Sequence, residues 1–113
     1  MSGELVYFEI PAADAGRART FYGELFGWHF KESTSDYFMI PDATPLAGLS
    51  GGEESSSPRV YFGVEDIKAG VERVRELGGH AGDPQEIPAG YFARCRDDQG
   101  IPFALWQSKE ESQ

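Results

Sequence analysis

Side chains that bind metals or form disulfides are scarce in this chain of 113 residues. There is one cysteine, Cys95, and there are two histidines, His29 and His80. A single cysteine excludes a disulfide within the chain, and no basic segment followed by an apolar one marks a secretion signal, so we expect a cytoplasmic protein. The histidines form no H-x-H or H-x-x-x-H pair, and we expect both at the surface.

Basic residues and long apolar runs are also few. The chain carries 10 lysines and arginines against 19 aspartates and glutamates, so its formal net charge is −9. Such a surface repels phosphate backbones and anionic lipids, which argues against nucleic acid and membranes as partners. No apolar segment approaches the roughly 20 residues of a membrane span. The apolar content suits a globular protein with a core.

The first half of the chain alternates strand and helix signals. Strands are expected where β-branched and aromatic residues gather, at residues 5–10 (ending at Pro11), 28–31, 37–40 and, more weakly, 46–49. After the first strand, Asp14 is a helix N-cap and Gly27 ends the helix. Its apolar face is predicted from residues at helical spacing: Ala15, Ala18, Phe21, Tyr22 and Leu25.

The second half repeats this order after a turn-rich stretch. Strands are expected at residues 59–64, at 81–87 with a break at Pro84, at 91–95 and at 103–106. Asp66 caps a helix with Ile67, Val71, Val74 and Leu77 on its apolar face. Two motifs recur at nearly the same offset: Val6-Tyr7-Phe8 as Val60-Tyr61-Phe62, and Glu24-Leu25-Phe26-Gly27 as Glu76-Leu77-Gly78-Gly79. The pattern predicts a duplicated unit.

The same segments resemble the vicinal-oxygen-chelate superfamily, that of glyoxalases, extradiol dioxygenases and bleomycin-resistance proteins. The resemblance rests on Phe8-Glu9-Ile10-Pro11 with residues 21–28, on residues 60–66 with 74–79, and on the closing turn and strand at 97–106. Asp98 departs from it, because proline is common there. The resemblance implies an α+β fold of two βαβββ modules whose curved sheets form a cleft, and a homodimer.

We expect one domain over residues 1–113. Its parts are module 1 at about residues 4–51, a linker at about 52–58, module 2 at about 59–107, and a polar tail at 108–113. Each module is too small to bury both faces of its own sheet, so the two are expected to pack together within one chain or with a copy from another chain.

Enzymes of the resembled family hold a divalent metal with four His or Glu side chains. The ligand positions fall on Tyr7, on Arg59, on Ala104 and, loosely, near residues 48–50. A protonated phenol, a permanent cation and a methyl group are not metal ligands, so we expect no metal and no cofactor. Cys95 lies between two arginines that strand alternation turns to the other face, so we expect a plain half-buried cysteine and not a nucleophile.

Side chains of a strand alternate between its two faces. Counting along each strand from these positions predicts one shared face that carries Tyr7, Glu9, Arg59, Tyr61 and Trp106. Aromatic walls with one acid and one base suit a small planar or amphipathic molecule. An equally open alternative is that the rings fill the core while Glu9 pairs with Arg59. The leading prediction is a metal-independent binding protein for a metabolite or antibiotic. The alternatives are a divergent lyase or isomerase with Glu9 as the base, and an interaction module without a small ligand.

Overall fold

The computed structural model describes residues 3–34, 36–53 and 57–109. The centre of the predicted linker and the end of the predicted polar tail lie outside the described residues. The chain divides into two compact units, one over Tyr7–Arg59 and one over Val60–Gln113 together with Met1–Val6. We call them the first and second unit. Among the described residues, no helix is long and apolar enough to cross a membrane.

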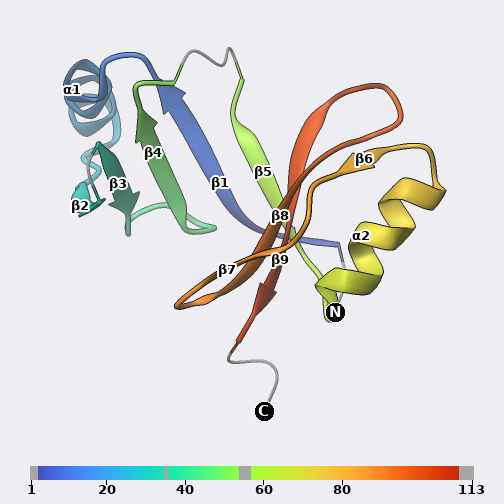
Figure 1. Cartoon of the computed structure of the whole chain (residues 1–113). Helices are drawn as coiled ribbons and strands as arrows, with labels where there is room; N and C mark the ends of the chain where they lie inside the picture. Colours follow the sequence, from blue (N-terminus) through green and yellow to red (C-terminus); the bar gives the residue numbers. More distant parts are fainter. Residues whose placement is uncertain (1–2, 35, 54–56, 110–113) are drawn as a thin grey trace. The chain divides into compact units, whose positions relative to one another are not determined.

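The first unit has the element order βαβββ (Figure 1). Its elements are β1 (Glu4–Ala12), α1 (Ala15–Phe26), β2 (Lys31–Thr34), β3 (Tyr37–Ile40) and β4 (Ala47–Gly51). Strand β4 pairs with β1 in parallel, while β3 pairs with β4 and β2 with β3 in antiparallel fashion. The first and last strands of the unit therefore lie side by side, and the helix provides the crossover connection.

The core of this unit lies between the sheet and α1. Ile40, Ala47 and Leu49 are fully buried, and Ala15 of the helix packs in the same cluster. The Asp14 carboxylate accepts the backbone N–H of Arg17, which caps the helix as the sequence predicts. Gly27 ends the helix with a positive φ of 74°, a conformation that glycine adopts without steric strain.

Two strand predictions in this unit are wrong. Strand β1 runs through Pro11 to Ala12. The N–H of Phe8 points to β4 and donates to the Leu46 carbonyl, and every second residue of the strand points the same way. The nitrogen of Pro11 therefore points away from β4, so proline costs no hydrogen bond to that strand. Residues 28–30 are not a strand. His29 donates its backbone N–H to the Asp42 carboxylate at 2.6 Å, and the Trp28 ring packs on α1 instead.

The second unit repeats this connectivity. Its elements are β5 (Arg59–Gly63), α2 (Ile67–Glu76), β6 (His80–Ala81), β7 (Gln85–Ile87), β8 (Gly90–Arg96) and β9 (Pro102–Ser108). Strand β9 pairs with β5 in parallel and with β8 in antiparallel fashion, and β6 and β7 both pair with β8. The strand predicted at residues 81–87 is thus interrupted near Pro84, as expected. The α+β class and the two βαβββ modules are confirmed.

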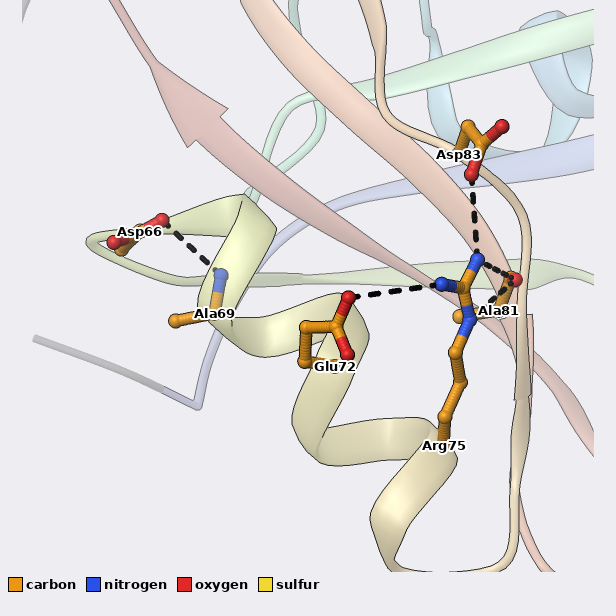
Figure 2. Close-up of polar contacts among 6 residues, drawn as sticks. All are labelled: Asp66, Ala69, Glu72, Arg75, Ala81 and Asp83. Atoms are coloured by element: carbon orange, nitrogen blue, oxygen red, sulfur yellow. Dashed lines mark hydrogen bonds and ion pairs between the residues drawn. The ribbon is translucent and has the colours of Figure 1, made fainter.

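Helix α2 is capped at its first turn and hydrogen-bonded to its sheet from its last turn. Asp66 caps it by accepting the N–H of Ala69, and Arg75 in its last turn donates to the Ala81 carbonyl of β6 at 2.8 Å (Figure 2). The same guanidinium lies near the carboxylates of Glu72 and Asp83. Together with the buried Val71, these contacts hold α2 against β6 and β8.

Candidate functional site

Four polar side chains of the first unit form one hydrogen-bonded chain, which we call the polar network. The Tyr37 hydroxyl donates to Oε2 of Glu9 at 2.8 Å, and Nη1 of Arg59 donates to Oε1 of the same carboxylate at 3.3 Å. The hydroxyls of Tyr7 and Tyr37 are also hydrogen-bonded. Because a phenol has a single proton and Tyr37 gives its proton to Glu9, the Tyr7 hydroxyl is the donor toward Tyr37 and, at 3.6 Å, toward the Met39 sulfur.

Strand register places the network on the sheet face away from α1. Glu9 of β1 and Met39 of β3 both lie opposite Gly48 of β4, so the three occupy one row across the sheet. Tyr7 and Tyr37 lie two residues from members of that row and share its face, because side chains of a strand alternate. Phe38 and Ile40 point the other way, into the core under the helix.

Gly48 makes the meeting of the two tyrosines possible. A Cβ atom at this position would overlap the hydroxyls of Tyr7 and Tyr37 and would lie 2.6 Å from Cζ of Tyr37. Only a residue without a side chain leaves the space in which the two phenols meet. Gly48 lies in the segment near which the resemblance loosely implies the remaining metal ligand, and in this chain the residue is needed for close packing.

The electrostatics of the network keep both phenols neutral. Burial raises the pKa of Tyr7, against a smaller opposing effect of its hydrogen bond to Tyr37. Burial also raises the pKa of Tyr37 far above its usual range, and the hydrogen bond with Tyr7 and the nearby Glu9 charge add to this. The Glu9 and Arg59 side chains are 12% and 25% exposed. A carboxylate and a guanidinium therefore remain within reach of a ligand, supported by two neutral hydroxyls.

A small hollow adjoins the Glu9 and Arg59 pair. It is lined by Glu9, Pro11, Ser50, Glu53, Ser57 and Arg59 and has a volume of about 10 Å³. That space suits one water molecule or one polar atom of a ligand, and not an organic molecule. Within the first unit, the network can thus anchor a polar group but cannot enclose a ligand.

The donor set does not fit a divalent cation. The Arg59 guanidinium lies on the Glu9 carboxylate, where its charge opposes a metal ion, and the raised pKa keeps Tyr7 protonated. Gly48 has no side chain to offer. Among the residues that the structure describes, no group of three or more His, Cys, Asp or Glu side chains could hold a metal ion.

The structure brings together three of the five predicted site residues, Tyr7, Glu9 and Arg59, and it forms the predicted ion pair of the last two. Tyr37 and Met39 were missed, because the sequence alone did not fix which residues of β3 face the network. Phe38 of β3 packs in the core, with the Arg19 guanidinium 4.4 Å from its ring centre.

The other two predicted residues belong to the second unit. Tyr61 lies opposite Ala104, and Trp106 lies opposite Gly63 and Phe92, so Tyr61, Trp106 and Phe92 share one sheet face. Phe62 and Leu105 take the opposite face. Arg94 follows Phe92 on the aromatic face, and its guanidinium is 6.0 Å from the Phe92 ring centre. Phe92 and Arg94 were not predicted for the site. The role of Tyr61 and Trp106 as ligand contacts stays a prediction.

Cys95 is more buried than expected, with 5% of its surface exposed. Its thiol donates to the Ala93 carbonyl at 3.6 Å, and burial raises its pKa against the opposing charge of Arg75. His29 is exposed, and its ring nitrogen Nδ1 lies 3.1 Å from the Asp42 carboxylate. These environments are those of structural residues and not of a nucleophile.

We therefore expect Cys95 to resist thiol reagents in the folded chain. Its reaction with Ellman's reagent at pH 8 should be slower than in the urea-unfolded chain by about 100-fold or more, because exposure needs local opening that costs roughly 3 kcal/mol or more. Stopped-flow absorbance measures both rates. Equal rates in the two states would contradict the buried, protonated thiol described above.

Comparison with known proteins agrees with the fold and the residue pattern. Residues 4–41 match the family model of the bleomycin resistance protein-like N-terminal domain. A "Glyoxylase-like domain-containing protein" of Didymella fabae is 34% identical over 91 residues, which cover 70% of this chain and 71% of that protein. The chain belongs to the glyoxalase and bleomycin-resistance family, within the vicinal-oxygen-chelate superfamily.

Two further similarities are to a longer protein and to a solved structure. The "Anthracycline biosynthesis protein DauV" of Streptomyces sp. (strain C5) is 30% identical over 118 residues; the match covers 96% of this chain and 42% of that protein. The crystal structure of methylmalonyl-CoA epimerase from Mycobacterium tuberculosis superposes with a TM-score of 0.69 at 16% identity, over 96% of this chain and 90% of that one. At that identity the likeness shows the fold alone.

Proposed function

We propose that this chain is a metal-independent binding protein for a small aromatic or amphipathic molecule, of the sequestering kind. The observation that carries the proposal is the polar network: a carboxylate, a guanidinium and two neutral phenols form one hydrogen-bonded chain. Two of its members, Tyr7 and Arg59, hold positions on which the resemblance implies metal ligands. Each charge has a partner inside the protein, so the site is prepared to exchange hydrogen bonds with a ligand without an ion.

The net charge and the relatives suggest which ligands to test first. A formal charge of −9 favours cationic over anionic molecules in the encounter. The matching family model and one relative carry bleomycin and anthracycline in their names. Metal-free bleomycin and the anthracycline daunorubicin are therefore the first probes. Tyr61 and Trp106 of the second unit, also predicted as ligand contacts, are tested separately.

The test is a calorimetric titration of the full chain in the presence of EDTA. We expect a Kd of about 10 μM or lower for at least one of the two probes, and a loss of about tenfold or more in E9Q, because a ligand donor would lose its charged acceptor. The matched control is E32Q, which removes the same charge from the exposed residue Glu32 of β2 and should bind like the wild type.

Two results would contradict this proposal. One is the absence of binding by both probes and by a broader panel of aromatic metabolites. The other is binding that appears only after a divalent metal is added. The variant W106A tests the aromatic face of the second unit by itself: unchanged affinity would show that Trp106 does not contact the ligand.

A second candidate is a divergent enzyme, a lyase or isomerase with Glu9 as its base. It is favoured by the carboxylate being 12% exposed and held in a fixed position by Tyr37 and Arg59. Both carboxylate oxygens already accept a hydrogen bond, so proton abstraction would require one of these bonds to be broken. Exchange of substrate C–H protons with D₂O, followed by NMR on methylmalonyl-CoA and other carbon acids and lost in E9Q, would favour the enzyme.

A further inference from the structure

An exposed guanidinium lies beside the aromatic rings of the second unit. Arg94 follows Phe92 on the same face of β8, and its guanidinium is 6.0 Å from the centre of the Phe92 ring. Among the residues that the structure describes, the Arg94 side chain has no carboxylate or carbonyl partner. The guanidinium of Arg59, by contrast, binds Glu9. Arg94 is therefore available to an anionic group of a ligand.

The two rings next to Arg94 lie on the surface of the sheet. Trp106 of β9 lies opposite Phe92, and both side chains are half-buried. A Cβ atom at Gly90 would lie 2.9 Å from Cζ2 and 3.0 Å from Cη2 of Trp106. The indole ring therefore extends over the backbone of Gly90, where a larger residue would displace it. Because the ring keeps part of its surface exposed, it offers a planar ligand a place to stack.

No carboxylate shares this face among the described residues of β7, β8 and β9. Glu86 of β7 lies opposite Tyr91, on the other side of the sheet, and Lys109 binds its charge there. Arg96, which follows Arg94 on the same face, adds a second positive charge. The net charge of −9 belongs to the chain as a whole. Salt screens charges beyond about 10 Å, so the guanidinium groups decide which ligands bind at this face.

We propose that the aromatic face of the second unit binds a planar aromatic ring that bears a carboxylate. The ring stacks on Trp106 and Phe92, and the carboxylate binds Arg94. A guanidinium matches a carboxylate with two parallel N–H···O bonds, which a neutral substituent cannot form. The inference rests on the proposed function, because Trp106 is one of the contacts predicted for the ligand, and it adds the chemical class of that ligand.

Two naphthalene probes that differ in charge test this class. They are 2-naphthoate and its neutral amide, 2-naphthamide, each titrated calorimetrically into the full chain at neutral pH. We expect the carboxylate to bind about fivefold more tightly, which is the effect of one exposed charge pair. The net charge of −9 would by itself produce the opposite order, because it repels the anion. A preference for the anion therefore reports a cation at the binding face.

Two variants separate the charge from the rings. R94M keeps the apolar stem and loses the charge, so it should bind both probes with equal affinity. W106A should weaken the binding of both probes alike, because it removes a stacking surface and keeps Arg94. The matched control is R73M, the same replacement at the exposed Arg73 of α2, which should keep the wild-type preference. Circular dichroism checks that the three variants keep the wild-type fold.

Three results would overturn the inference. They are a wild-type chain that binds the two probes equally or not at all, a preference for the carboxylate that persists in R94M, and a W106A chain that binds both probes like the wild type. Equal binding that W106A weakens would overturn the anionic class alone and would support the proposed binding function. If neither probe binds, the inference fails, while the titrations with bleomycin and daunorubicin still decide the proposed function.

Discussion

The variant G48A should lose about 2 to 3 kcal/mol of unfolding free energy, because overpacking of a filled space costs of this order. The added methyl group would overlap the hydroxyls of Tyr7 and Tyr37 and approach Cζ of Tyr37 to 2.6 Å. A tyrosine hydroxyl is attached to a rigid ring, so the clash is relieved only if a whole side chain or strand moves. Urea unfolding followed by tryptophan fluorescence measures the loss.

The matched control is G23A. Gly23 lies inside α1, and a Cβ there would meet only the Trp28 carbonyl at an ordinary 3.6 Å. Alanine in a helix interior is favoured over glycine by about 0.5 to 1 kcal/mol, so G23A should be slightly more stable than the wild type. A G48A chain as stable as the wild type would mean that the phenols do not meet over β4.

A second variant connects the clash to the network. Y37F alone should cost about 1 kcal/mol, because Glu9 and Tyr7 lose a hydrogen-bond partner. In G48A the same change also removes one of the two oxygens that the methyl group would strike, the hydroxyl of Tyr37. The double variant should therefore be more stable than the sum of the two single losses predicts, and purely additive losses would place the strain elsewhere.

The sequence predicted those parts of the fold that depend on residues close together in the chain. Asp14 and Gly27 bound α1 because a capping carboxylate and a left-handed glycine act within one turn of the helix. The segment at residues 28–30 failed as a strand because its partner is remote: Asp42 binds the backbone of His29 from 13 residues away. Aromatic composition alone cannot distinguish a strand from a segment that packs its rings on a helix.

The alternation of side chains along each strand predicted part of the candidate site. Counting along each strand from the ligand positions that the resemblance implies placed Glu9 with Tyr7, Tyr61 with Arg59, and Trp106 with Ala104. Tyr37 was missed because its place depends on the register of β3 against β4, with Met39 opposite Gly48. Register is a tertiary property, and a shift of one residue would have turned Phe38 toward the network instead. Phe21 and Leu25 were predicted on the apolar face of α1, and both are exposed. Helical spacing predicts an apolar face but not what covers it.

Removal of the Glu9 carboxylate should be nearly as costly as the added methyl group. E9A leaves the Arg59 guanidinium and the Tyr37 hydroxyl without their acceptor, at sites where the two ionic side chains are 12% and 25% exposed. Removing the partner of a partly buried charge destabilises a protein more than removing the partner of a surface charge. We therefore expect E9A to lose about 2 to 3 kcal/mol of unfolding free energy in urea unfolding. R59M should cost less, since Glu9 retains the hydrogen bond from Tyr37.

A double-variant cycle then separates the pair from its surroundings. E9A with R59M removes both charges, so the double variant should recover about 1 to 2 kcal/mol relative to the sum of the single losses. The exposed pair of Arg73 and Glu76, with side chains 66% and 63% exposed, is the matched control, and its coupling should stay below about 0.5 kcal/mol. If both cycles gave the same small coupling, Glu9 and Arg59 would be an ordinary solvated pair. The polar network would then have no charge held in place for a ligand to meet.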